Sequence, residues 1–258
     1  MRSEGHPMNF IRIYSQVYKS CKTLFKNVFR LFDVMIWPYI QFFSFILFIG
    51  YFSNGQPEAL GVVVLGLMGW RLMHHMHLEV VSNFMDEYWS RCLAHLMISP
   101  LTKLEYIIGS AIGGLAKGIF VTIVFYILAH YLYGFQIANM ANVLLGLAII
   151  SLFGIATGII CLGVSYIYNE DVFSSALVVP DILVLLAGVY YPVSIFPGVL
   201  KDIAYLLPAT YGFEMLRNEP VSLAAVAVLL AVWLGASWLI LIWCYDYARK
   251  TGKLTKFG

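Results

Sequence analysis

Long apolar runs alternate with short polar stretches along the chain. Each run has roughly 18 to 28 residues, enough for a helix to cross the ~30 Å hydrocarbon core of a bilayer. Strands of a membrane barrel would instead alternate in character over segments of about ten residues. The pattern therefore predicts an all-α membrane protein with six transmembrane helices. We expect them at residues 34–51, 60–80, 106–133, 143–168, 172–190 and 221–244.

The N-terminal region carries basic residues at helical spacing over residues 10–32, opposite an apolar side. This pattern predicts an amphipathic helix in the membrane surface with its basic side toward anionic headgroups. An ordinary basic segment beside the membrane is the alternative. We expect residues 1–32 to form this region, 33–244 the membrane domain and 245–258 a basic tail. The basic positions are Arg12, Lys19, Lys22, Lys26 and Arg30.

A charged, aromatic interruption at residues 82–105 separates the second and third runs. At helical spacing its apolar and charged side chains fall on adjacent faces, which predicts a short amphipathic helix over residues 83–97 on the membrane surface. Pro100 ends that helix. Thr102 and Glu105 form a capping-box pattern, so a new helix is expected to begin there.

The region after the fifth run is too apolar for a free loop and too short for two membrane crossings. Residues 191–217 are expected to form a re-entrant hairpin of two short helices in the outer leaflet, with neighbouring protein satisfying the broken backbone. Pro180, next to Asp181, is expected to break the fifth run near its middle. Glycines spaced four apart in the third and fourth runs predict close helix contacts. These are Gly109, Gly113, Gly114, Gly118, Gly154 and Gly158.

Composition indicates a membrane protein, and the distribution of charge indicates how the chain is oriented in the membrane. The 258 residues are 61% hydrophobic and 12% charged, whereas soluble domains are about 25% charged. Twelve of the 16 lysines and arginines fall in the N-terminal region, residues 82–105 and the C-terminal tail. The positive-inside rule places those three segments, and so both termini, in the cytoplasm. The chain is expected in a prokaryotic inner membrane, in contact with lipids and with no nucleic-acid partner.

The polar residues inside the apolar runs are the candidate functional residues. His74 and His77 share a helix face, but ligands so close on one rigid helix surround an ion poorly, and polar contacts are favoured over a metal. An unpaired Asp181 at the bilayer centre costs at least about 2.5 kcal/mol. Either it belongs to a substrate path, with Tyr190 and Tyr191, or it pairs with Lys117, Arg71 or a broken backbone turn. The four cysteines have no paired spacing, so neither a disulfide framework nor a metal site is expected.

Three motifs, in this order and on the expected sides of the membrane, resemble the permease subunits of type-two ABC exporters, and the resemblance covers nearly the whole chain. The motifs are Phe32-Asp33 with Trp37-Pro38; Met85-Asp-Glu-Tyr-Trp-Ser-Arg-Cys-Leu93 with Ser99-Pro100-Leu101 and Glu105-Tyr106; and Tyr191-Pro-Val-Ser-Ile-Phe-Pro197 with Leu207-Pro-Ala-Thr-Tyr211 and Glu214-Met-Leu-Arg217.

The resemblance implies a permease that pairs with a second copy, as a homodimer or close heterodimer, and recruits two copies of a separate ABC ATPase. The segment 83–97 would then be the coupling helix. The chain has no phosphate-binding loop, so ATP and magnesium are expected on the partner, and no enzyme activity or cofactor is expected here. The expected ATPase-coupling residues are Asp86, Glu87, Tyr88, Trp89 and Arg91.

Two other function classes are alternatives. An ion-driven secondary transporter would use Asp181 and Lys117 as a proton relay, but the inverted internal symmetry typical of such proteins is not apparent. An intramembrane enzyme would use the residues from His74 to Glu79 and would need catalytic groups from other helices. For the permease, the expected cargo is amphipathic: a lipid-linked glycan, a lipid or a hydrophobic drug-like molecule.

Overall fold

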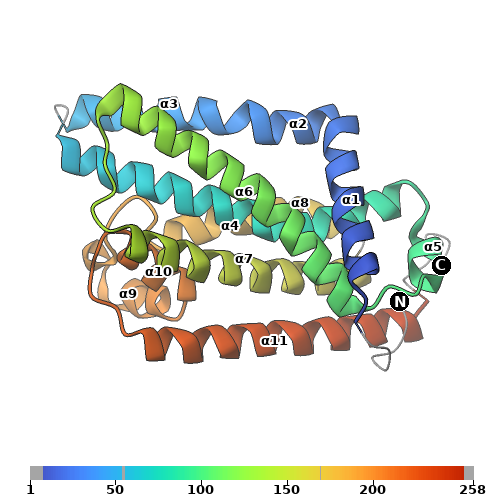
Figure 1. Ribbon diagram of the computed structural model, residues 1–258. Coiled ribbons are helices and arrows are strands. Elements are labelled where there is room, and N and C mark those ends of the chain that lie inside the picture. The colour runs from blue at the N-terminus through green and yellow to red at the C-terminus, as the bar shows by residue number, and fades with distance from the viewer. Residues whose placement is uncertain (1–7, 54–55, 169, 253–258) are drawn as a thin grey trace.

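The computed structural model describes residues 8–53, 56–168 and 170–252, without the side chains of residues 57, 94 and 170–177. Helices form all the regular secondary structure in these ranges. Five helical stretches of the described part are long and apolar enough to span a membrane. They lie lengthwise beside one another (Figure 1). They are Val28–Phe52, Glu58–Trp89, Lys103–Tyr133, Met140–Tyr168 and Leu223–Lys250.

The N-terminal helix is present but ends earlier than predicted. Helix α1 is Phe10–Lys26, and a second helix, α2, is Val28–Met35. The prediction of one helix to residue 32 was wrong because Asn27 leaves the helical conformation and caps α2, where its side chain accepts bonds from the amides of Phe29 and Arg30. Helix α3, Trp37–Phe52, follows directly and has Pro38 in its first turn, where a missing N–H costs little.

Helix α4, Pro57–Trp89, is the central element and packs against α3 and five later helices, most extensively against α6 and α7. It continues far beyond the predicted end of the second span. The prediction of a separate helix over residues 83–97 was therefore wrong: its first half is the last two turns of α4, and α5 is only Leu93–Ile98. No glycine or proline interrupts residues 70–89, so one helix continues through the polar stretch.

Helices α6, Lys103–Tyr133, and α7, Met140–Tyr168, flank α4. The predicted capping box begins α6, since Thr102 and Glu105 exchange the two expected bonds. The predicted glycine contacts are also confirmed. A Cβ on Gly114 would lie 2.7 Å from the His75 carbonyl oxygen, and one on Gly158 would lie 2.8 Å from that of His77. Glycine therefore lets both helices approach the backbone of α4.

Helix α8, Glu170–Leu186, corresponds to the predicted fifth span. Its 17 residues reach about 26 Å at 1.5 Å per residue, slightly less than the hydrocarbon core. The helix continues through Pro180, so the predicted break at that residue was wrong. The backbone of α8 packs on α4 and α7.

The predicted hairpin at residues 191–217 consists of two short helices, as expected. A 3₁₀ turn, η1 (Val193–Ile195), precedes α9 (Gly198–Tyr205) and α10 (Pro208–Leu216). Helix α10 is almost wholly buried and packs on α7. Helix α11, Leu223–Lys250, then returns along α7 and extends six residues beyond the predicted end at residue 244.

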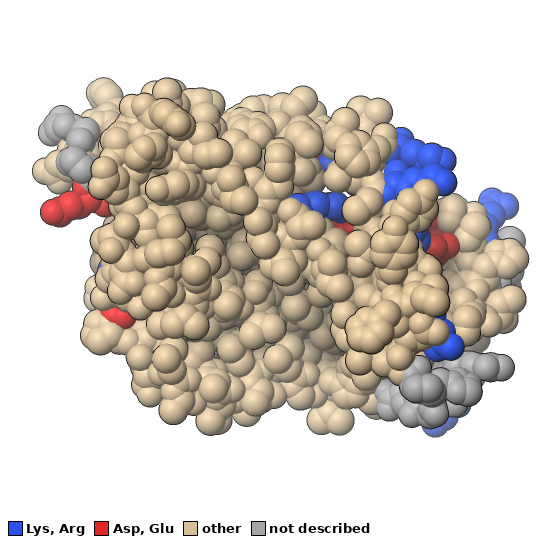
Figure 2. All heavy atoms as spheres, viewed as in Figure 1, with Lys and Arg blue, Asp and Glu red and all other residues tan. Residues whose placement is uncertain are grey.

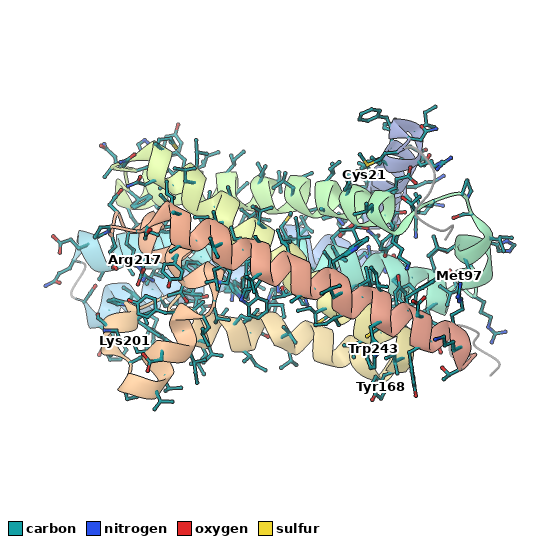
Figure 3. The ribbon with its side chains drawn as sticks, turned by 90° about the horizontal axis from the view of Figure 1, so that it is seen from below. Cys21, Met97, Tyr168, Lys201, Arg217 and Trp243 are labelled. Carbon is teal, nitrogen blue, oxygen red and sulfur yellow. The ribbon has the colours of Figure 1, made fainter. Side chains whose placement is uncertain are left out.

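The two ends of the bundle differ in charge. Helices α1 and α5 and the C-terminal end of α11 lie at one end, whereas α9 and α10 lie at the other (Figure 1). On the face drawn in Figure 2, lysines and arginines gather at the first of these ends. We call it the basic end. Figure 3 shows Cys21 and Met97 there, with Lys201 and Arg217 at the opposite end.

Candidate functional site

The acidic residues expected to contact a partner are paired within the chain at the basic end. Asp86 Oδ2 lies 2.7 Å from Arg30 Nη2 of α2. Glu87 forms an ion pair with Lys19 of α1, whose ammonium also donates to the Asn83 carbonyl. These pairs hold α1 and α2 against the last two turns of α4.

The other three expected coupling residues differ in exposure. Tyr88 is 7% exposed and belongs to a core cluster with Leu93 and Leu96 of α5, so its ring is already buried within the chain. Trp89 is 45% exposed, and Arg91 is exposed in the turn between α4 and α5. Of the five, these two present the most surface to a partner.

Arg91 lies in a helix-ending turn of defined geometry. Its φ is 59°, in the left-handed region that side chains rarely adopt. The Cys92 amide donates to the Glu87 carbonyl and the Arg91 amide to that of Tyr88, which together form a Schellman motif. This turn ends α4 and redirects the chain into α5 at the edge of the basic end.

A buried polar network connects α1, α4 and α6. Lys117 Nζ donates to Glu79 Oε2 at 2.6 Å, and both side chains are less than 10% exposed. The Asn83 amide donates to Glu79 and to the hydroxyls of Ser20 and Ser110, at 3.3, 2.9 and 3.1 Å. The acid that pairs with Lys117 is thus Glu79, and not Asp181 as one of the sequence alternatives had it. Because each helix contributes a partner, the network joins α1 to the spans.

The histidine cluster is divided between two environments. His77 Nδ1 lies 2.9 Å from the Thr157 hydroxyl on α7. His74 and His75 each approach the Asp33 carboxylate to 4.0 Å, and Arg71 donates to the Asp33 carbonyl at 2.8 Å. Among the described residues no group of His, Cys, Asp and Glu is arranged to hold a metal ion. His77 thus contacts a polar side chain of α7, and His74 and His75 lie near the Asp33 carboxylate.

Asp181 lies on a cavity of about 580 Å³ that extends along α4 between α2–α3 and α8. Asp181 is exposed, and no hydrogen bond or ion pair joins it to another described residue. Pairing with Lys117 is excluded because that ammonium binds Glu79. Tyr190 stacks on Phe45 with ring centroids 4.6 Å apart, and Tyr191 donates to the Leu185 carbonyl. Neither tyrosine lines this cavity.

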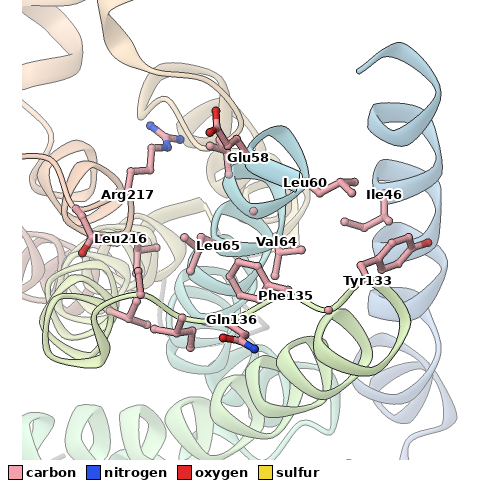
Figure 4. A pocket seen from close by; sticks show the side chains of 17 residues that line it. Ile46, Glu58, Leu60, Val64, Leu65, Tyr133, Phe135, Gln136, Leu216 and Arg217 are labelled. Atoms are coloured by element: carbon pink, nitrogen blue, oxygen red, sulfur yellow. The ribbon is translucent and has the colours of Figure 1, made fainter. Parts of the chain in front are cut away.

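A second cavity, of about 460 Å³, lies at the opposite end between α3, α4 and the start of α7 (Figure 4). On α4, Leu65 lines this cavity and Trp70 the first one. Leu67, between them, is fully buried, as is Phe42 on the adjoining α3. Packed side chains thus separate the two cavities along α3 and α4.

The hairpin is fastened to the spans by buried polar contacts. Arg217 donates to the carbonyls of Gly188 and Val189, the latter at 2.8 Å, and burial lowers the pKa of its guanidinium. Tyr205 donates to Glu214 Oε1 at 2.8 Å, and this bond raises the pKa of Tyr205 to about 12. Burial raises the pKa of Glu214. The Arg217 bonds satisfy two backbone carbonyls beyond the end of α8, and the Tyr205–Glu214 bond joins α9 to α10.

The docking of α1 gives a direct prediction. Glu87→Lys places two like charges at the Lys19 contact. A partly exposed ion pair stabilises by about 1 kcal/mol, so its loss is expected to accelerate hydrogen exchange of the α1 amides about five-fold. Lys19→Glu alone should have a similar effect, and the double exchange should restore protection. Equal exchange in all four proteins, measured by mass spectrometry, would contradict this pairing.

Comparisons with known proteins agree with this architecture. The model of the family described as ABC-2 type transporter matches residues 15–219. The inner membrane transport permease YadH of Escherichia coli K12 is 26% identical over 193 residues, covering 73% of this chain and 74% of the relative. YadH of Shigella flexneri has the same identity and coverage. With a family match over most of its length and five helices able to span a membrane, the chain belongs to the ABC-2 type transporter family and is a permease subunit.

Proposed function

We propose that this chain forms the substrate path of an ATP-driven exporter and is moved by a separate ATPase bound at the basic end. The observation that carries the proposal is the exposed turn at Arg91, at the end of α4. Because α4 packs on α3, α6, α7 and α8, a displacement of its end acts on most of the bundle. Docking of α1 and α2 on the same end gives an ATPase a single rigid surface.

The topology proposed for this function has six spans, with α8 as the fifth and both termini in the cytoplasm. The concentration of lysine and arginine at the basic end supports that orientation. Similarity to YadH, an inner membrane transport permease, supports an inner-membrane location. As the resemblance implies, two copies of the chain would pair, and two ATPase subunits would supply ATP and magnesium.

An outward path requires the bundle to change its packing. The cavity with Asp181, called the basic-side cavity below, lies nearer the basic end. In the present arrangement Phe42 and Leu67 separate it from the cavity at the opposite end. ATP-driven closure of the partner would rock the spans and open this barrier. The proposed cargo is amphipathic, since the basic-side cavity has both charged and apolar walls.

The ion-driven alternative is less well supported by the geometry. A relay between Asp181 and Lys117 would need the ammonium to exchange protons with the carboxylate. Lys117 is engaged by Glu79 at 2.6 Å, whereas Asp181 belongs to another helix and has no ion-pair partner in the described part of the chain. ATP-driven transport therefore remains the proposal.

Arg91 variants test the coupling. Arg91→Gly suits the left-handed turn and removes the side chain, so the fold should be retained while stimulation of ATP hydrolysis by the permease falls at least about five-fold, as expected for an interface anchor. Arg91→Lys should retain part of the stimulation. The measurement is ATPase activity of the reconstituted permease with the ATP-binding protein that copurifies with it.

Lys201→Ala at the opposite end provides the control, because it also removes an exposed cation, suits the helix α9 in which Lys201 lies, and should leave stimulation unchanged. If the Arg91→Gly permease stimulates ATP hydrolysis as strongly as the unchanged chain, the turn at Arg91 has no part in the coupling. If the purified chain transports cargo without any ATP-binding partner, the ATP-driven proposal is rejected.

A further inference from the structure

A groove of about 520 Å³ lies between α6 and α7, with α4 as its floor. Figure 1 shows α6 running obliquely across α4, so that it diverges from α7 toward the end where α9 and α10 lie. Met68 and Leu72, on the floor, are buried, whereas Ile123 and Leu144, on the two rims, are 52% and 60% exposed. Because α6 and α7 are both long and apolar enough to span a membrane, the groove opens toward the lipid.

The groove extends from the opposite end only to the middle of the bundle. Its lining covers residues 115–126 of α6 and residues 140–151 of α7, and α7 begins at Met140. At 1.5 Å per residue, each rim is about 16 Å long. Beyond it Gly154 brings α7 onto α4, since a Cβ there would lie 2.8 Å from a backbone carbonyl oxygen of α4. The groove thus has the depth of one leaflet, about half of the ~30 Å hydrocarbon core.

The lining is apolar, and its inner hydroxyls are used within the chain. Thr122 donates to the Met68 carbonyl at 3.3 Å, and Ser151 donates to the Ala148 carbonyl at 2.8 Å. The third hydroxyl belongs to Tyr126, the lining residue of α6 that is nearest the opposite end. A polar group inside the groove would be desolvated without gaining a hydrogen bond. The lining therefore favours a hydrocarbon ligand.

We propose that this groove binds one acyl chain of a membrane phospholipid whose headgroup lies at the opposite end of the bundle. A transmembrane helix of a second copy would cross the whole core, whereas the groove has the length of a single leaflet. The groove and the basic-side cavity share no lining residue in the described part of the chain. The phospholipid is therefore a resident ligand and not the cargo, and the inference goes beyond the proposed function.

Native mass spectrometry of the full chain, purified from membranes in mild detergent, tests occupancy. One phospholipid per chain is expected to remain after a detergent wash that removes the other lipids. Ala148→Phe, at an exposed lining position, should lower the retained phospholipid at least about five-fold, because its ring occupies the apolar space of the acyl chain. Ala227→Phe makes the same change at an exposed position of α11 and should leave retention unchanged.

Photolabelling of the unchanged chain in lipid nanodiscs tests the position of the acyl chain. A phospholipid with a diazirine at the end of one chain should label Leu115 and Ile119, and one with the diazirine next to the ester should label Ile123 and Met140. Phe120 is the internal control, because it is 42% exposed, against 43% for Ile119, and lies outside the lining. Phe120 should be labelled at least about five-fold less than Ile119, since the groove holds its ligand whereas bulk lipid exchanges.

The outcomes separate the site from general lipid contact. Equal labelling of Ile119 and Phe120, equal effects of the two phenylalanine variants, or no retained phospholipid would overturn the site. A disulfide between two chains carrying Ile123→Cys would show that a second copy covers the groove and would also overturn it. The labelling test needs no variant, so it decides even if Ala148→Phe does not fold. Because neither experiment includes an ATPase or cargo, the lipid site and the coupling proposed at Arg91 stand or fall separately.

Discussion

Lys117→Met is expected to destabilise the protein by about 3 to 5 kcal/mol, the cost of leaving a buried charge without its partner. Glu79 is 4% exposed, and its carboxylate receives the Lys117 ammonium at 2.6 Å. Removing the ammonium leaves Glu79, among the residues that the structure describes, with only the Asn83 amide as a donor, at 3.3 Å. Because the same network joins α1 to α4 and α6, the loss of stability should be accompanied by weaker docking of α1. The measurement is the unfolding midpoint in detergent, together with hydrogen exchange of α1.

The double variant Glu79→Gln/Lys117→Met provides the control. Glutamine retains an acceptor for Asn83 and carries no charge, so most of the lost stability should return. Lys201→Met, which changes an exposed lysine at the opposite end, should alter the midpoint little. If the double variant is as unstable as Lys117→Met alone, the cost does not arise from an unpaired Glu79.

Local sequence signals predicted the elements that depend on local physics. Helices form over all six predicted apolar runs, because burying backbone polar groups in lipid requires helices. Thr102 and Glu105 formed the predicted cap, and the hairpin at residues 191–217 contains the two expected short helices. Each of these signals involves residues only a few positions apart, so a single sequence is sufficient to recognise it.

Tertiary pairing was not visible in the sequence. Asp86 and Glu87 were expected to be available to a partner, but Arg30 and Lys19, more than fifty positions earlier, neutralise them. Tyr88 has the right character for an interface anchor, yet its ring is within the core. Amphipathicity shows that a residue is on an apolar face but not which surface covers that face. Arg91 is therefore a cleaner test of coupling than Tyr88.

The cavity with Asp181 could not be predicted from the sequence either. Asp181 stood out because an acid in an apolar run is costly, and the sequence left its partner open among Lys117, Arg71 and the backbone. In the structure Lys117 donates to Glu79, and Arg71 donates to Asp33. Asp33 appeared in a sequence motif without an assigned role, and no sequence signal singled out Trp70. Their shared position depends on the packing of α2–α3 on α4, which no local pattern encodes.

Gly154→Ala is expected to destabilise the protein by about 1 to 3 kcal/mol, as overpacking of a tight helix contact does. A Cβ at this position of α7 would lie 2.8 Å from the carbonyl oxygen of Met73 and 3.2 Å from its Cα. Both are backbone atoms of α4, so no side-chain rotation relieves the clash and the two helices must separate. The measurement is the unfolding midpoint of the purified chain.

Gly235→Ala is the matched control and is expected to have the opposite sign. This glycine lies within α11, and no described atom is within 4 Å of the position that an alanine methyl group would take, so alanine should stabilise by about 0.5 to 1 kcal/mol through helix propensity. Opposite signs for one chemical change would show that Gly154 serves helix contact and not backbone flexibility. Stabilisation by both variants would contradict the close packing of α7 on α4, and with it the transmission of movement from the basic end through α4 to its neighbours.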